Sequence, residues 1–414
     1  MRLLFDDLFW LHGCLAPMKW TAFANIRAHD QHRVFRACDV DDFVSASLGP
    51  ERCGLIIGER TDERVTRKIA ESLPWATLIA NDCDEPPEWW TGPWIGSIRR
   101  GPSVQPGDVL SVSPGSPVVR FLHRRASRAN VLFVTARCNC LCLMCSQPPI
   151  EENDDWRFEE LLAQIELIDR QVPELTITGG EPTLLGEKLG QLIARCKEHL
   201  PNTALHVLSN GRLLADGVLA TRLARIQHHD LVWGIPLNAE VARVHDEIMG
   251  APGAFAETML GIHHLLRAGH KVEIRVILQA GNIDRLPEIA RYIFWNMPNV
   301  VHVTFMGLEP IGLARKNAAK IRIDVASHVG SLREALGFLE SRGIVASLYN
   351  IPLCLVDRDL WRFCRKSISD WKSAYLAACA GCGAKTECCG FFDSVTPEWV
   401  STRVARIVSM DGAA

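Results

Sequence analysis

The feature that most constrains the fold of this chain is the regular alternation of strand-like and helix-like segments between residues 131 and 350. Short apolar runs, typical of buried strands, are separated by stretches in which apolar residues recur every three or four positions. The strand-like runs are Val131–Thr135, Leu175–Thr178, Leu205–Leu208, Leu231–Ile235, Val272–Leu278, Val300–Phe305 and Ile344–Leu348. Repeats of this kind build a parallel sheet covered by helices. The sequence therefore predicts an α/β fold, a partial or full β/α barrel.

Amphipathic helices are expected between these runs. One apolar stripe spans 189–196, another spans 259–266, and a third spans 329–339, opened by Asp324 and closed by Gly343. In barrels of this type the chemistry lies at the C-terminal ends of the strands, in the loops that follow them. Functional residues are therefore expected in those loops.

Three cysteines lie in the loop that follows the first strand-like run. Cys138, Cys142 and Cys145 have the spacing C-x3-C-x2-C. A short loop of this kind can offer three thiolates to a cubic iron–sulfur cluster, which leaves one iron free to bind something else. Four-coordinate structural zinc would leave no open position. Cys140 lies in the same loop, so the alternative is that it completes a four-thiolate zinc site.

This loop resembles the signature of the radical S-adenosylmethionine (radical SAM) enzymes. In that family SAM chelates the free iron of a [4Fe-4S] cluster, and an electron from the cluster cleaves SAM to a 5′-deoxyadenosyl radical. The run Gly179-Gly180-Glu181-Pro182, which follows the second strand-like run, matches the family's GGEP motif, whose backbone and glutamate contact the SAM amino group. The resemblance implies a partial (β/α)6 TIM-type barrel in which the three spaced cysteines hold the catalytic cluster.

Further SAM-binding residues are implied by the same resemblance. Ser209 and Asn210, after the third strand-like run, match the position of polar groups near the SAM ribose, although a plain turn explains Asn-Gly equally well. Asn238 follows the fourth run. Arg275, in the fifth run, is the candidate for the SAM carboxylate, with a structural ion pair to Glu273 as the alternative.

Three more residues complete the predicted site. Met144 stands where many relatives carry an aromatic residue that packs on the adenine, and a thioether can make a similar contact. Asn282 and Glu309 lie just past the fifth and sixth strand-like runs, and they are the candidates that face the substrate.

A second group of cysteines lies in the C-terminal part of the chain. Cys379, Cys382 and Cys388 have the spacing C-x2-C-x5-C, and Cys354 precedes them. This resembles the core of the auxiliary-cluster extension, of the SPASM or shorter Twitch type, found in radical SAM peptide-modifying enzymes. It implies a second [4Fe-4S] cluster on these four thiols, whereas a zinc site that only folds the tail is the alternative. The two possible replacement ligands are Cys364 and Cys389.

Residues 1–125 are predicted to form a small α+β or mostly β domain that binds a partner or buttresses the barrel. Short runs such as Val109–Val112 and Val118–Leu122 are separated there by turns rich in glycine and proline. The basic stretch 122–128 is either a solvated linker or a groove for an acidic leader peptide. The other predicted parts are the core barrel at 126–343, the auxiliary extension at 344–395 and a tail at 396–414.

Composition narrows the class of protein. A net charge of −3 over 414 residues provides no overall positive field that would favour nucleic acid. Ten of the fifteen cysteines lie within 138–145 and 354–389, which indicates metal ligands and not a set of disulfides. No apolar stretch is long enough to span a bilayer, and Met1–Asp7 makes a poor secretory signal. A cytoplasmic protein without a membrane partner is therefore expected.

Between about 120 and 395 the chain resembles the radical SAM maturases of the His-Xaa-Ser repeat peptide system, the HxsC type. The segments that carry this resemblance are Cys142–Pro149, Gly179–Gly186 and Ile351–Leu355. It implies an enzyme that modifies a ribosomally made precursor peptide, with an electron donor of the flavodoxin or ferredoxin type and a second radical SAM maturase as partners. The alternatives are a radical SAM enzyme that acts on a small molecule or nucleotide, and a non-catalytic, metal-stapled partner subunit.

Overall fold

The computed structural model describes residues 21–58, 63–370 and 372–408. The segment Met1–Asp7 and the end of the predicted tail lie outside the described residues. The chain divides into two compact units, and each is described by itself. The first comprises 1–134, 154–177 and 191–204, and the second comprises 135–153, 178–190 and 205–414.

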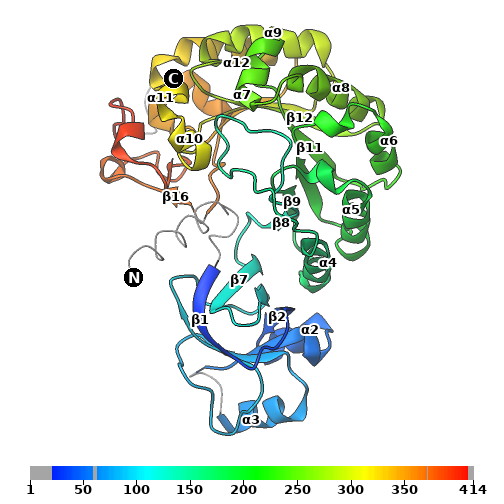
Figure 1. Cartoon of the computed structure of the whole chain (residues 1–414). Coiled ribbons are helices and arrows are strands. Elements are labelled where there is room, and N and C mark those ends of the chain that lie inside the picture. The colour runs from blue at the N-terminus through cyan, green and yellow to red at the C-terminus, as the bar shows by residue number, and fades with distance from the viewer. Residues whose placement is uncertain (1–20, 59–62, 371, 409–414) are drawn as a thin grey trace. The chain divides into compact units, whose positions relative to one another are not determined.

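The first unit contains a closed barrel of strands in the order β1-β5-β4-β3-β2-β6-β7 (Figure 1). The strands are β1 Thr21–Arg27, β2 Arg33–Cys38, β3 Cys53–Ile56, β4 Thr77–Ala80, β5 Trp94–Arg99, β6 Val109–Val112 and β7 Val118–His123. Strands β2 to β5 pair in parallel, and helices α2 (Val40–Ala46) and α3 (Glu63–Ser72) connect them. The remaining pairs are antiparallel. This part is α+β, as the sequence predicts.

Apolar side chains fill the interior of this small barrel. Trp94, Leu78 and Leu55 are fully buried and belong to one cluster that covers the inner face of α3. His123, the last residue of β7, is also buried at 2% exposure, and its Nδ1 has no hydrogen-bond partner within the described residues. Burial lowers the pKa of His123 to about 3, because a protonated imidazole loses its hydration there.

Strands β8 and β9 belong mainly to the first unit, and in the second unit strands β10 to β15 form a sheet in which the strand order follows the chain order. The strands are β8 Val131–Phe133, β9 Glu174–Thr178, β10 Ala204–Leu208, β11 Leu231–Pro236, β12 Lys271–Ile277, β13 His302–Met306, β14 Ala346–Tyr349 and β15 Cys364–Arg365. Strands β10 to β15 of the second unit pair in parallel. The prediction of an α/β partial barrel is confirmed.

Helices separate these strands along the chain (Figure 1). They are α4 Arg157–Leu167, α5 Glu187–His199, α6 Val218–Ala224, α7 Ala242–Met249, α8 Ala254–Arg267, α9 Leu286–Asn296, α10 Gly312–Lys316, α11 Ala318–Ile321 and α12 Val329–Ser341. One predicted helix start is wrong. Asp324 caps the 3-10 turn Val325–Ser327 by accepting from the Ala326 N–H, and α12 begins only after His328.

The C-terminal extension of the second unit contains little regular structure. Strands β16 (Ser373–Ala374) and β17 (Phe391–Phe392) form a short antiparallel pair.

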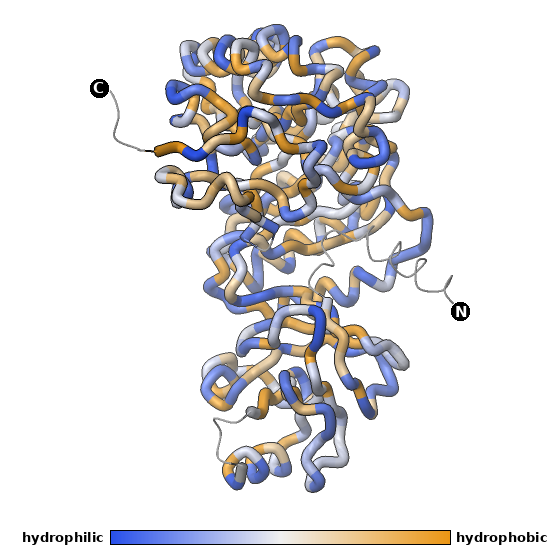
Figure 2. Tube along the Cα trace, turned by 90° about the vertical axis from the view of Figure 1, so that its left-hand side faces the viewer, coloured by the Kyte–Doolittle hydropathy of each residue, from blue (hydrophilic) through white to orange (hydrophobic). Residues whose placement is uncertain are grey.

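Figure 2 shows hydrophobic and hydrophilic residues interspersed along the trace of the whole chain. Over the described ranges, no helix combines the length and the apolar character needed to cross a bilayer.

Candidate active site

The GGEP turn is attached directly to the start of the three-Cys loop. The Gly180 N–H donates to the Thr135 carbonyl at 2.7 Å, and the Glu181 N–H donates to the Arg137 carbonyl at 2.9 Å. A Cβ atom on Gly179 would lie 2.4 Å from the Thr135 oxygen, and one on Gly180 would lie 2.1 Å from the Arg137 oxygen. Both glycines are therefore required because two backbones meet here. The structure brings the two predicted motifs together.

The Glu181 carboxylate is completely buried and accepts four hydrogen bonds. Oε1 accepts from the Thr183 N–H at 2.9 Å, from the Thr183 hydroxyl at 2.5 Å and from the Ser209 hydroxyl at 2.7 Å. Oε2 accepts from the Asn210 N–H at 2.7 Å. Burial raises the pKa of Glu181, and these hydrogen bonds oppose that effect. In this structure the side chain joins the GGEP turn to the end of β10.

Asn210 and Arg212 lie against the three-Cys loop. Asn210 Nδ2 donates to Asn139 Oδ1 at 2.6 Å and lies 3.4 Å from Cys140 Sγ. Arg212 donates to the Asn139 carbonyl and lies 3.5 Å from Cys140 Sγ, while its Nε donates to Glu257 at 2.6 Å. The sequence prediction includes Asn210 but misses Arg212, although its position two residues further along the same turn was a usable signal.

The four thiols of the loop differ in environment. Cys140 is buried, and hydrogen bonds from Cys138, Cys142 and Arg212 lower its pKa to about 3 against the effect of burial. The contacts with Cys140 and burial raise the pKa values of Cys138 and Cys142. Cys140 is thus the thiol of this loop that accepts from Arg212.

The three spaced cysteines have the donor chemistry that a [4Fe-4S] cluster requires. Cys138, Cys142 and Cys145 are partly exposed thiols on one loop. Within the described ranges no three Cys, His or carboxylate side chains already converge on a metal position. Cys145 donates to the Gln147 carbonyl at 2.8 Å and Cys142 contacts Met249 Sδ at 3.8 Å, so these thiols must leave their present partners to take a cluster.

The other predicted SAM-binding residues make contacts within the protein. Asn238 is fully buried, donates to Met249 Sδ at 3.5 Å and accepts from the Ile277 N–H at 3.1 Å. Arg275 lies 3.4 Å from Glu273, which is the structural ion pair that the sequence left open as an alternative. Their roles toward SAM stay predictions, as do those of Met144 and Pro182.

Asn282 and Glu309, the two residues predicted to face the substrate, have different partners in the structure. Asn282 is fully buried, and its amide donates to the carbonyls of Asn238 and Ile277, so the prediction that it faces the substrate is wrong. The physical reason is that the loop after β12 turns back on itself and needs these hydrogen bonds. Glu309 forms an ion pair with Lys372 at 2.8 Å.

Main-chain N–H groups surround the second group of cysteines. Cys388 Sγ accepts from the N–H groups of Leu353 and Gly390, each at 3.4 Å, and Cys382 Sγ accepts from the Ile407 N–H at 3.4 Å. Contact with the neighbouring Cys389 thiol, followed by these N–H groups, lowers the pKa of Cys388 to about 6. Such donors favour thiolates.

Cys364 and Cys389 have the opposite hydrogen-bonding role. Cys389 is buried with Ile368 and Phe392, and its thiol donates to the Gly390 carbonyl at 3.3 Å. The Cys364 thiol donates to the Leu360 carbonyl at 3.7 Å, and burial raises its pKa to about 12. The two cysteines that the sequence left ambiguous are therefore held as neutral thiols in this structure.

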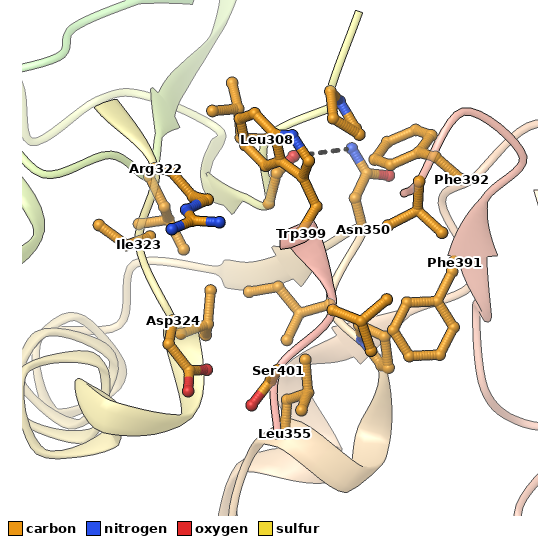
Figure 3. A pocket seen from close by; sticks show the side chains of 18 of the residues that line it. Leu308, Arg322, Ile323, Asp324, Asn350, Leu355, Phe391, Phe392, Trp399 and Ser401 are labelled. Carbon is orange, nitrogen blue, oxygen red and sulfur yellow. Dashed lines mark hydrogen bonds between the residues drawn. The ribbon is translucent and has the colours of Figure 1, made fainter. Parts of the chain in front are cut away.

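A cavity of about 370 Å³ lies in the second unit, at the C-terminal ends of β12, β13 and β14 (Figure 3). Leu308 and Pro310 line it just before α10, and Ile351 and Leu355 line it on either side of Cys354. The tail adds further walls. These are the aromatic side chains of Phe391, Phe392 and Trp399. The polar residues that line the cavity are Arg322, Asp324, Asn350 and Ser401.

Comparison with known proteins identifies a family for the middle part of the chain. Residues 132–293 match the sequence model of the Radical SAM superfamily. This segment therefore corresponds to a radical SAM domain, and members of that family use a [4Fe-4S] cluster and SAM. It lies within the barrel predicted at 126–343.

Two curated relatives match part of the chain. One is the pre-heme d1 synthase of Dinoroseobacter shibae, 31% identical over 163 residues, which are 38% of each chain. Another is the Fe-coproporphyrin III synthase of Methanosarcina barkeri, 28% identical over 159 residues, also 38% of each chain. The matched segment thus spans well under half the length of these relatives.

Among solved structures, SuiB of Streptococcus suis bound to S-adenosylmethionine has a TM-score of 0.42 and 14% identity, and the match covers 53% of this chain and 49% of that chain. The narrower resemblance to His-Xaa-Ser system maturases stays a prediction.

Proposed function

We propose that this radical SAM enzyme modifies a ribosomally made peptide in the cytoplasm and carries a second iron–sulfur cluster in its C-terminal extension. Cys138, Cys142 and Cys145 would hold the first cluster, which would supply the electron that cleaves SAM to methionine and the 5′-deoxyadenosyl radical. The chain's own residues hold the loop, exclude water and position the substrate. A flavodoxin- or ferredoxin-type donor provides the electron, and a second maturase acts beside it.

The observation that carries this proposal is the set of main-chain N–H groups directed at the tail thiols. Hydrogen bonds to cluster sulfurs are one of the means by which proteins set iron–sulfur potentials. Cys382 and Cys388 already accept such bonds, and an N–H of Ala405 acts in the same sense on Cys354. We take these three, with Cys379, as the auxiliary ligands. An extension of this type is what the resemblance associates with peptide substrates.

A second candidate function is radical SAM chemistry on a tetrapyrrole. The observation that favours it is the names of the two curated relatives, pre-heme d1 synthase and Fe-coproporphyrin III synthase. Their similarity to this chain covers only 38% of it, so it bears on the shared chemistry more than on the substrate.

The test begins with anaerobic reconstitution of the wild type, a Cys138/Cys142/Cys145→Ala triple variant and a control, Cys83→Ala, whose thiol is exposed in the first unit. Iron per chain and 5′-deoxyadenosine are measured after reduction with SAM. The wild type and the control are expected to hold two clusters and to cleave SAM. The triple variant is expected to keep one cluster and to be inactive. Zinc in place of iron in the tail would refute the auxiliary cluster.

The substrate class is tested with the same preparations. The wild type is incubated with SAM, a reductant and either a synthetic peptide with His-Xaa-Ser repeats or a set of iron tetrapyrroles, and the products are analysed by mass spectrometry. A mass change in the peptide that depends on SAM supports the proposal. A mass change in the tetrapyrrole alone would replace it by the second candidate.

A further inference from the structure

The backbone of the three-Cys loop is held by two separate groups of contacts from distant parts of the second unit. Near the start of the loop, Arg212 donates to the Asn139 carbonyl and contacts the Cys140 thiol. Near its end, Asn317 Nδ2 donates to the Leu143 carbonyl at 2.9 Å. Both donors are half-buried, and side-chain hydrogen bonds to loop carbonyls fix the path of that loop.

The second group of contacts is built around α10. The Leu313 N–H donates to the Cys145 carbonyl at 2.8 Å, so the carbonyls on both sides of Met144 bind to α10 and the residue after it. Gly312 has a φ of +57°, and a Cβ atom there would lie 2.6 Å from the Cys145 oxygen. A side chain at 312 would therefore separate the helix from the loop.

The first group of contacts brings a positive charge to the loop. The Arg212 side chain is only 15% exposed, and Glu257 on α8 orients its guanidinium. Asn210 adds a second bond to Asn139 at 2.6 Å. A guanidinium beside a cluster-binding loop favours the state with more negative charge, which for a cluster is the reduced one.

We propose that Arg212 and Asn317 are positioning residues with separate tasks. Arg212 retains the cluster and favours its reduction, whereas Asn317 fixes the Leu143–Cys145 segment, and with it Met144, for SAM. The inference rests on the proposed SAM-binding cluster and adds two residues outside the sequence motifs. We call these two groups of contacts the Arg212 clamp and the Asn317 clamp. Because they bind different ends of the loop, removal of the first should change iron retention and the midpoint potential, whereas removal of the second should change the KM for SAM.

The Asn317 clamp is tested with Asn317→Ala and a matched control, Asn296→Ala. Asn296 also donates its Nδ2 to a backbone carbonyl, that of Tyr292 at 2.9 Å, but on the exposed end of α9. Loss of one hydrogen bond is expected to raise the KM for SAM about three- to tenfold in Asn317→Ala. Iron per chain stays at the wild-type level, and the control matches the wild type in both quantities.

The Arg212 clamp is tested with Arg212→Met, Arg212→Lys and a control, Arg222→Met, whose side chain forms an exposed ion pair with Glu187. Arg212→Met is expected to lose iron faster and to show a more negative midpoint potential for the SAM-binding cluster. The Lys variant restores the charge, so its potential returns toward that of the wild type. The melting temperature of the metal-free variants shows whether each one folds.

Two results would overturn the inference. One is that Arg212→Met and Asn317→Ala both match the wild type in iron retention, midpoint potential and the KM for SAM. The other is the same loss of iron and the same change in KM in both variants, which would make the two clamps one structural unit. Failure of the proposed function would be distinguishable, because a wild type that leaves the peptide unchanged, with or without SAM cleavage, could still be compared with the Arg212 variants in iron retention.

Discussion

Replacement of Glu181 by Gln tests whether this carboxylate is a structural clamp. In the metal-free protein, Oε1 accepts three hydrogen bonds and Oε2 accepts one, from the Asn210 N–H. A Gln side chain keeps the size but offers only one acceptor oxygen. If that oxygen takes the Oε1 position, the amide nitrogen faces the Asn210 N–H at about the 2.7 Å that now separates donor and acceptor. Two donors then oppose each other.

The expected cost follows from this geometry. A hydrogen bond to a charged group contributes about 1.5–3 kcal/mol, and an unsatisfied buried donor costs about 1–3 kcal/mol. These two effects overlap at Asn210, so Glu181→Gln should lower the free energy of unfolding by about 2–4 kcal/mol. The loss should be present without cluster or SAM, because every partner of the carboxylate belongs to the protein.

The assay is urea unfolding of the metal-free wild type and variant at pH 7, followed by tryptophan fluorescence, together with SAM affinity in the reconstituted proteins. A side chain whose only role is to contact SAM would lower the affinity for SAM and leave the stability of the metal-free protein unchanged. That result, a difference in unfolding free energy below about 0.5 kcal/mol, would refute the clamp.

Three further predictions concern other parts of the chain. Gly312→Ala should lose iron readily on gel filtration, because its Cβ meets the Cys145 oxygen at 2.6 Å, whereas Gly115→Ala, also at positive φ but with nothing within 4 Å of its Cβ, should keep its iron. Burial lowers the pKa of His123 from 6.5 to about 3. Between pH 6.5 and pH 3 the unfolded chain therefore binds a proton at this residue that the folded chain does not bind. The free energy of unfolding falls as the pH falls through this range. From pH 7 to 5 the wild type should lose about 2 kcal/mol more than His123→Leu in urea unfolding. Cys388→Ser should remove the iron of the proposed auxiliary cluster on reconstitution, whereas Cys389→Ser should retain it; equal loss in both variants would contradict the proposed ligands.

Periodicity alone was enough to predict the barrel. The strand-like runs became β8 to β14 with ends that differ by at most two residues, because each run is apolar and short and is bounded by a turn or a helix. Where the ends differ, backbone contacts decide. Val131–Thr135 was predicted as one strand, but β8 stops at Phe133, and the Thr135 carbonyl accepts from the GGEP turn instead.

The motifs were recognisable in the sequence, but the direction of their side chains was not. The order of the strands predicted only that Glu181 and Asn210 lie in loops at the same end of the barrel. That Glu181 would accept four protein hydrogen bonds, that Asn282 would face the backbone and that Arg212 would hold the loop depends on contacts between residues far apart in the chain. Such contacts have no local sequence pattern. The same applies to Cys388 and Cys389, adjacent in sequence and opposite in hydrogen-bonding role.

The hydrogen bonds to the tail thiols come from the main chain, and this determines which amino-acid substitutions the extension tolerates. At Leu353 and Ile407 any side chain leaves the N–H group in place, so nearly every substitution at these positions preserves the donor to Cys388 or Cys382. Proline is the exception, since it has no N–H. The electrostatic environment of these sulfurs is therefore a property of the fold of the tail, and related chains can share it without sharing the residues that provide it.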